Sequence, residues 1–287
     1  MHWTSRRERF RVLLNGTQCV HPGSVYDAIS ARIAEDLGFE VGMFAGSVGS
    51  LSVLGAPDLI VLTLTEFAQQ AYRICRAGDL ALLVDADHGY GNALNVKRTV
   101  EELETAGVCA LTIEDTILPT PHGEIGKPHM ISIEEGAGKM RAALEGRQDS
   151  NLVIAGRTSA VSITNLDDAI LRANAYADAG VDAMFFTGLQ TVAQLDAISA
   201  AVKIPIFLGG ITDELSDKDM LAAKGVRIAL QGHMPIMAGI QAVHDTLKAL
   251  RDGTPPKALK GVASGDLMAR FTRAADYKRQ TADFLGD

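Results

Sequence analysis

Short apolar runs alternate with helix-length segments along the chain, and this alternation restricts the possible folds more than any other feature. The intervening segments repeat apolar residues at a spacing of about 3.6, as amphipathic helices do. Glycines follow four of these segments, which is typical of helix C-termini, at Gly38, Gly107, Gly180 and Gly225. We expect strands at Thr17–His21, Val41–Ala45, Leu80–Val84, Ala110–Ile113, Leu152–Gly156, Ala183–Thr187, Ile204–Leu208 and Arg227–Leu230.

Continuous apolar strands that alternate with helices indicate parallel strands buried on both faces. Eight such units fit an eightfold α/β barrel (a (β/α)8 TIM barrel) better than an open doubly wound sheet, and no Gly-x-Gly-x-x-Gly motif opens the first helix. We therefore expect one barrel domain over residues 1–287, with residues 264–285 forming an extra C-terminal helix after the break at Asp252-Gly-Thr-Pro-Pro256.

Length and charge narrow the class of protein further. A chain of 287 residues is long enough for two average domains, but an α/β barrel of about 250 residues folds as one unit. The formal net charge of −8 argues against a nucleic-acid partner, which would require a basic surface. It leaves room for an anionic small substrate, because a metal ion or a few arginines can reverse the local field.

Cysteine content and hydrophobicity indicate the compartment. The three cysteines, Cys19, Cys75 and Cys109, are too few and too scattered for a disulfide framework, so we expect a reduced, cytoplasmic protein. The N-terminus has no apolar core after its arginines and does not read as a signal peptide. Glycines interrupt the longest uncharged stretch, Val41–Pro57, so we expect no membrane insertion.

Polar residues follow several of the predicted strands directly. In such barrels the carboxyl ends of the strands carry the chemistry, so these residues are expected to meet at one mouth. They are Ser47 after the second strand, Asp85 and Asp87 after the third, Glu114 after the fourth, Arg157 after the fifth and His233 after the eighth.

The three acids at successive strand ends predict a site for a hard cation. Oxygen ligands of this kind suit Mg²⁺, which keeps several waters and takes its remaining ligands from the substrate. Asp58 would join Asp85, Asp87 and Glu114 as a partner of a metal-bound water. Any one of these acids could equally well cap a helix or a turn; the set favours a metal.

The remaining polar residues have two interpretations each. Arg157 suits a substrate carboxylate, although it could instead form a structural ion pair with one of the acids. The Gly46-Ser47-Val48 turn could offer backbone N–H groups and a hydroxyl to an anion, or could exist only for packing. His88 and His233, without further context, are most simply structural histidines.

Several segments in the right order resemble the isocitrate lyase/phosphoenolpyruvate mutase superfamily. They are Tyr26–Arg32, Gly46-Ser47, the Asp85–Asn92 segment (DADHGYGN), Ile113-Glu114-Asp115 and Arg157-Thr158. The resemblance implies an α/β barrel that binds Mg²⁺, with Mn²⁺ able to substitute, and a 2-oxo-carboxylate or its enolate. It also implies that the last helix is exchanged between the subunits of a dimer within a homotetramer.

The resemblance assigns roles to individual residues. Asp85 corresponds to the direct metal ligand, whereas Asp58, Asp87 and Glu114 correspond to ligands that act through water. Arg157 corresponds to the arginine that holds the substrate carboxylate. Ser47 and the amide of Val48 correspond to the oxygen-binding turn.

Differences within the superfamily point to one branch. Isocitrate and methylisocitrate lyases carry a catalytic cysteine in the loop after the fourth strand, and loop 116–130 has none. The mutase and phosphonopyruvate hydrolase members carry a lysine where this chain has Thr116. His88, Glu114-Asp115-Thr116 and Gly232-His233 instead resemble the oxaloacetate decarboxylase members, although Gly209-Gly210 replaces a tyrosine and Ser159 replaces Asn or Asp.

The expected activity is therefore Mg²⁺-dependent decarboxylation of oxaloacetate to pyruvate and CO₂ through an enolate. Arg157 and Ser47 would hold the C1 carboxylate, and His233 would position the leaving carboxylate or supply a proton path. One alternative is a C–C lyase or hydrolase acting on a related 2-oxo or 2-hydroxy diacid, like methylisocitrate lyase or phosphonopyruvate hydrolase. In that case Glu124 or His122 would replace the missing cysteine. Another alternative is a 2-oxo-acid-binding protein without turnover.

Overall fold

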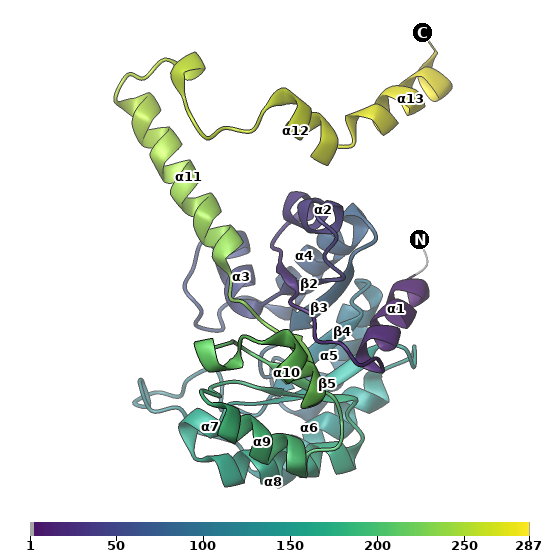
Figure 1. Ribbon diagram of the computed structural model, residues 1–287, viewed down its shortest axis with the longest axis vertical. Helices are drawn as coiled ribbons and strands as arrows, with labels where there is room; N and C mark the ends of the chain where they lie inside the picture. Colours follow the sequence, from purple (N-terminus) through teal and green to yellow (C-terminus); the bar gives the residue numbers. More distant parts are fainter. Residues whose placement is uncertain (1–2, 287) are drawn as a thin grey trace.

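The computed structural model describes residues 3–286 and contains one sheet of eight parallel strands, which are hydrogen-bonded in the order β1 to β8. Helices surround this sheet (Figure 1). Each strand pairs in parallel with the next one along the chain, which confirms the predicted α/β barrel. The strands are β1 (Gly23–Ser24), β2 (Val41–Phe44), β3 (Ala81–Asp85), β4 (Ala110–Glu114), β5 (Val153–Thr158), β6 (Ala183–Phe186), β7 (Ile206–Leu208) and β8 (Val226–Ala229).

Helices connect the strands and cover the barrel. They are α1 (Thr4–Leu14), α2 (Ala28–Asp36), α3 (Gly46–Gly49), the π-helical turn η1 (Ser50–Leu54), α4 (Leu64–Ala77), α5 (Ala93–Thr105), α6 (Ile133–Gly146), α7 (Ala160–Ile163), α8 (Leu166–Ala179), α9 (Val192–Ala201), the 3-10 turn η2 (Asp213–Leu215), α10 (Lys218–Ala223), α11 (Met234–Arg251), the 3-10 turn η3 (Pro256–Ala258), α12 (Gly265–Phe271) and α13 (Ala274–Leu285). Side-chain caps start many of them. Asn92, for example, accepts hydrogen bonds from the amides of Leu94 and Asn95 at the start of α5.

The barrel closes through a single residue. Val20 forms an isolated parallel bridge with β8, in which its amide donates to Arg227 O (2.9 Å) and its carbonyl accepts from Ala229 N (3.0 Å). The prediction of a strand at Thr17–His21 was wrong, because the strand that pairs with β2 is Gly23–Ser24. Pro22, which has no N–H to donate, separates the two pairings, so the segment changes partners there.

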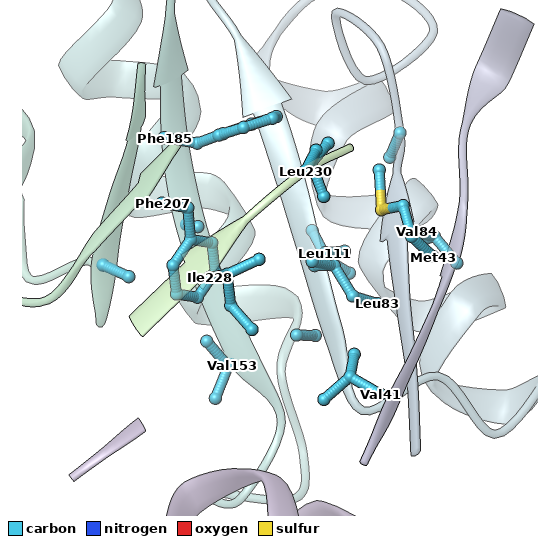
Figure 2. Packing of buried hydrophobic residues seen from close by; sticks show 14 of the residues in the cluster. Val41, Met43, Leu83, Val84, Leu111, Val153, Phe185, Phe207, Ile228 and Leu230 are labelled. Carbon is cyan, nitrogen blue, oxygen red and sulfur yellow. The ribbon is translucent and has the colours of Figure 1, made fainter. Parts of the chain in front are cut away.

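Apolar side chains fill the interior of the barrel (Figure 2). Val41 and Val153 lie at the end where the strands begin, and Met43, Phe185 and Leu230 lie at the opposite end. The interior is therefore a packed core and not a pore, as is usual for this architecture. Met43, Phe185 and Leu230 also line the cavity described below, so the top of the core forms its floor.

An N-terminal helix that was not predicted, α1, lies against the barrel where the strands begin (Figure 1). Phe10 of α1 is fully buried and contacts Phe207 of β7 edge to face, with ring centroids 6.5 Å apart. Arg6 and Arg7 of the same helix are also buried. The helix thus closes the amino-terminal end of the barrel.

The C-terminal region departs from the prediction of one extra helix at residues 264–285. Two helices, α12 and α13, occupy this region, and they are separated at Arg273, whose φ of 57° does not continue a helix. The departure from the barrel also begins earlier, because α11 already projects away from it and buries only Ile236 (Figure 1). We refer to residues 234–286 as the C-terminal arm.

The end of the arm returns to its own barrel at α2. Arg32 donates to Phe271 O (3.1 Å), and Arg270 forms an ion pair with Asp36 (2.5 Å). No residue of α12 or α13 is buried. Exchange of the arm between subunits therefore stays a prediction.

Across residues 3–286 no helix combines the length and the hydrophobicity needed to cross a membrane. The thiols of Cys19, Cys75 and Cys109 are free and buried.

Candidate active site

A cavity of about 430 Å³ opens at the carboxyl ends of the strands. Seven of the eight residues singled out in the sequence contribute to its wall. The lining residues are Met43, Ala45, Ser47, Asp58, Leu59, Ile60, Asp85, Asp87, Glu114, Leu118, Pro119, Thr120, Arg157, Phe185, Thr187, Gly209, Leu230 and His233. Seven of the side chains predicted to meet at the barrel mouth therefore lie around one cavity.

Arg157, on β5, links the acids of the two preceding strands. Its Nη1 donates to Asp85 Oδ2, and its Nη2 lies 3.2 Å from Glu114 Oε2. The alternative of an ion pair with the acids is therefore realised in this structure. Among the described residues, however, the buried Nε of Arg157 has no hydrogen-bond partner, so one donor stays available for a bound anion.

Asp85 is held in place from two other directions. Thr112, on β4, donates its hydroxyl to Asp85 Oδ1 (3.0 Å), and the amide of Asp87 donates to the same oxygen (3.3 Å). The carboxylate is also mostly buried at the end of β3. Three donors therefore fix the orientation of its oxygens toward the cavity.

Asp87 lies in a tight turn directly after β3. Its φ is 48°, which is uncommon for a residue other than glycine. Both oxygens of its carboxylate lie 2.5 Å from the position that a Cβ on Gly46 would occupy. A glycine at position 46 is therefore required for the α3 turn to approach this carboxylate so closely.

Burial and mutual repulsion shape the electrostatics of the acids. Burial, followed by the charges of Asp85, Glu114 and Asp58, raises the pKa of Asp87 well above its usual value. Burial raises the pKa of Glu114 to about 7, against the opposing effect of Arg157. Burial and Asp85 also raise the pKa of Asp58. The protein thus concentrates carboxylates where their ionised forms need a compensating cation.

The donor set fits a magnesium ion. Asp58 and Asp87 form no ion pair with a lysine or arginine in residues 3–286, so their charges lack a protein partner there. In the same residues no three Asp, Glu, His or Cys side chains have the mutual spacing of a preformed metal site, and Arg157 lies between Asp85 and Glu114. Carboxylate oxygens suit Mg²⁺, which typically takes one or two of them from a protein and fills its other positions with water and substrate oxygens.

His233 directly precedes α11, and its side chain lines the cavity together with the acids. Its Nδ1 is 2.9 Å from the hydroxyl of Ser24 on β1, and this contact orients the ring. Burial lowers the pKa of His233, which favours the neutral imidazole. Ser24 was not predicted as a site residue, because the first strand was expected at Thr17–His21, whereas β1 is Gly23–Ser24.

Ser47 lines the cavity, whereas Val48 does not, and its side chain is buried in the core. A role for the Val48 amide stays a prediction. Ser159, one of the departures from the decarboxylase pattern, accepts a hydrogen bond from Thr187 Oγ1 (2.7 Å) and so supports a residue of the cavity wall.

Loop 116–130 lies over one side of the cavity. A bridge between Thr116 and Met130 closes its base, and Leu118, Pro119 and Thr120 line the cavity. Glu124, by contrast, is at the exposed tip, where it contacts His129 Nε2 (3.0 Å). Neither Glu124 nor His122 belongs to the lining, so neither occupies the place of the missing cysteine.

Comparisons with known proteins place the chain among enzymes of one family. The family model described as phosphoenolpyruvate phosphomutase matches residues 10–251. A protein of Bradyrhizobium diazoefficiens named oxaloacetate decarboxylase is 63% identical over 286 residues, which cover 100% of this chain and 99% of the relative. A solved structure of oxaloacetate acetylhydrolase with the inhibitor 3,3-difluorooxalacetate has a TM-score of 0.87 and 28% identity, and covers 99% of this chain and 98% of that one. A structure of phosphonopyruvate hydrolase with oxalate and Mg²⁺ has a TM-score of 0.85 and 25% identity, and covers 98% of this chain and 99% of that one.

Proposed function

Because the chain belongs to the phosphoenolpyruvate mutase/isocitrate lyase superfamily, we propose that it decarboxylates oxaloacetate to pyruvate and CO₂ with Mg²⁺ as cofactor. The observation that carries the proposal is the placement of Arg157 in a cavity lined by four carboxylates, with its buried Nε free of partners in the described residues. Such a site needs a cation to balance its acids before it can accept an anionic substrate beside Arg157. Full-length identity of 63% to a named oxaloacetate decarboxylase supports this substrate.

Arg157 and Ser47 bind the end of the substrate that does not react. The Arg157 guanidinium, which is planar and always charged, pairs with the C1 carboxylate, and the Ser47 hydroxyl adds a second contact. Holding this end fixes the direction of the C3–C4 bond relative to the C2 carbonyl. The C3–C4 bond can then break with its electron pair passing to C3 and the carbonyl oxygen, and CO₂ leaves.

Asp85 would hold the metal directly, and Asp58, Asp87 and Glu114 would hold it through water. When bound, Mg²⁺ or Mn²⁺ supplies Lewis-acid polarisation of the substrate oxygens and balances the carboxylates of the protein. Thr112 and the Asp87 amide keep the Asp85 carboxylate in one orientation for this task.

His233 acts on the end of the substrate that reacts. Where the Ser24 hydroxyl donates to Nδ1, the neutral ring carries its proton on Nε2. This N–H can position the ionised leaving carboxylate by a hydrogen bond, and after CO₂ has left the ring can supply a proton to C3 of the enolate. Apolar neighbours, among them Phe185 and Leu230, limit solvation of the leaving carboxylate.

The C–C lyase or hydrolase alternative finds less support. It requires Glu124 or His122 to take the role of a loop cysteine, and both residues lie outside the cavity wall. A binding protein without turnover is disfavoured by the acids and arginine that the cavity keeps together.

The test is a panel of 2-oxo and 2-hydroxy diacids with Mg²⁺ or Mn²⁺, in which CO₂ and each product are measured. Oxaloacetate should give pyruvate and CO₂, whereas a hydrolase would give oxalate and acetate.

We expect Asp85→Ala to abolish metal-dependent CO₂ release and His233→Ala to reduce it while oxalate still binds. Asp196→Ala, which changes an exposed acid on α9, serves as the control. Full activity of Asp85→Ala would exclude the metal assignment.

Two predictions concern the protein's assembly and location. We infer a homotetramer built from two arm-exchanged dimers, supported by the apolar residues that α11 exposes, among them Met237, Ile240, Val243 and Leu247. A cytoplasmic location stays a prediction from the sequence, as does the absence of a nucleic-acid partner.

A further inference from the structure

The turn at residues 86–89, which carries Asp87 into the cavity, is held in an unfavourable backbone conformation. Asp87 and Tyr90 have φ values of 48° and 59°, and they are two of the four non-glycine residues with positive φ in residues 3–286. Conformations of this kind cost about 1–3 kcal/mol each and persist only where the surroundings determine them. The contacts that hold the turn therefore decide where the Asp87 carboxylate lies.

All four carbonyls of the turn accept a hydrogen bond, and each donor belongs to a different part of the fold. Ala86 O accepts from Gly89 N within the turn (3.0 Å), and Asp87 O accepts from Glu114 N of β4 (2.8 Å). The remaining two donors are side chains, one from each of the next two helices. They are Lys139 Nζ of α6, which donates to His88 O (3.0 Å), and Thr99 Oγ1 of α5, which donates to Gly89 O (3.0 Å).

Lys139 and Thr99 are unusual residues for their positions. Lys139 is 4% exposed and Thr99 is fully buried, although lysine and threonine are mostly found at the surface. Neither residue lines the cavity. The hydrogen bond to His88 O is the only one that the Lys139 ammonium makes within the described residues. A buried ammonium that serves a single carbonyl is costly, which indicates that the carbonyl's position matters.

We propose that Lys139 and Thr99 are positioning residues, which clamp the 86–89 turn and thereby place the Asp87 carboxylate for metal binding. The inference rests on the proposed magnesium site and extends it to residues behind the cavity. Outer residues that orient metal-binding groups commonly change metal affinity or activity by 10- to 100-fold when they are replaced.

Loss of the Lys139 charge and loss of its positioning contact should change the affinity for Mg²⁺ in opposite directions, and this difference makes the proposal testable. The Lys139 charge acts on Glu114, so loss of the charge alone should strengthen binding of a cation. Loss of positioning should weaken it. Thr99 carries no charge, so Thr99→Val reports on position alone. Its hydroxyl also lies 2.9 Å from Asn95 O, so the two carbonyls share its one proton, and Thr99→Ser keeps this hydroxyl.

The experiment measures Mg²⁺ binding by titration calorimetry, with no substrate present, on the full-length protein. We expect Thr99→Val and Lys139→Met to raise the Mg²⁺ dissociation constant about tenfold or more, and Thr99→Ser to restore it to within about twofold. Lys97→Met, which changes an exposed lysine of α5, is the control. Hydrogen exchange should also quicken in peptides that cover residues 86–91 in the first two variants.

Two outcomes separate this inference from the proposed function. If the unaltered protein binds no Mg²⁺, the metal assignment itself fails. If it binds Mg²⁺ and Thr99→Val binds with the same affinity and the same exchange rates, the clamp is overturned while the metal site stands. Thr99→Val preserves the shape of a buried side chain, so the test does not depend on how well Lys139→Met folds.

Discussion

At the scale of single residues, the backbone of Gly46 comes so near the Asp87 carboxylate that no side chain fits at position 46 without movement. The α3 turn and the turn after β3 belong to neighbouring strands, and they meet where a Cβ would lie 2.5 Å from both carboxylate oxygens. Contacts this short between a side chain and a carboxylate do not occur without movement. The hydrogen atom of glycine is thus part of the geometry of the acid cluster.

We predict that Gly46→Ala lowers catalytic activity and Mg²⁺ affinity about tenfold or more, because the new methyl group displaces the Asp87 carboxylate. The matched control is Gly138→Ala on α6, where the nearest atom to a new Cβ is 3.8 Å away. This control should keep full activity and gain up to about 1 kcal/mol in unfolding free energy from helix propensity. Steady-state assays and Mg²⁺ titrations measure both effects, and normal activity of Gly46→Ala would contradict the argument.

The residues that the sequence predicted correctly for the cavity share one property. Asp85, Glu114 and Arg157 end apolar strands, so a polar residue there stands out against its neighbours. Thr112 and Lys139 do not stand out in this way. Thr112 lies inside an apolar strand and Lys139 lies in a helix with several other polar residues, so only the three-dimensional structure reveals that they support Asp85 and the 86–89 turn.

At the scale of elements, α1 shows how a polar segment can close a core. Arg7 is 4% exposed, and each of its three guanidinium nitrogens donates a hydrogen bond: Nε to Val108 O (2.9 Å), Nη2 to Glu104 O (2.5 Å) and Nη1 to Asp149 Oδ2 (3.0 Å). Sequence periodicity did not predict this helix, because arginines normally indicate a solvent-exposed face. Their burial depends on carbonyls and acids that are distant in the sequence.

We predict that Arg7→Met lowers the free energy of unfolding by about 3 kcal/mol, since Asp149 and two carbonyls lose a partner inside the protein. Arg9→Met is the control, because Arg9 belongs to the same helix and its side chain is 51% exposed. That change should cost less than about 1 kcal/mol. Urea unfolding of the two variants gives both values, and equal losses would show that the Arg7 contacts contribute nothing particular.

The same ion pair predicts a dependence of stability on pH. Burial opposes ionisation of Asp149, but the Asn151 amide and Arg7 outweigh it, so the pKa of Asp149 lies below its usual value. A lowered pKa contributes stability that is complete above the unfolded-state value of about 4 and is lost as the pH falls further. Between pH 5 and pH 3, the Arg7→Met variant should therefore lose less of its remaining stability than the unaltered protein. A parallel loss in both would contradict this assignment.

At the scale of the whole molecule, the C-terminal arm carries an apolar face that the rest of the chain does not cover. Helix α11 exposes more than half of the surface of Met237, Ile240, Val243 and Leu247, which is costly for a helix that stays in water. The barrel order was predictable because each unit carries its own pattern. The path of the arm was not predictable, because the pattern of a single strand–helix unit does not indicate what covers the apolar face of α11.

We predict that Ile240→Lys combined with Val243→Lys splits the proposed tetramer into smaller species, because both exposed apolar side chains would lie in the proposed interface and two charges would be buried there. Gln241→Lys on the same helix is the control, since Gln241 pairs with Asp245 on the polar side. Size-exclusion chromatography with light scattering measures the masses. A monomeric unaltered protein would contradict the arm-exchange proposal directly.

The single-residue closure of the barrel at Val20 has a consequence for biosynthesis. Val20 leaves the ribosome early, whereas its partners Arg227 and Ala229 are among the last parts of the barrel to be made. Strands β1 to β7 can pair one after another during translation, but the ring cannot be completed until the segment that carries Ala229 has emerged. Until then, the backbone N–H and C=O groups of Val20 have no partner in β8, and the nascent barrel keeps an open edge there.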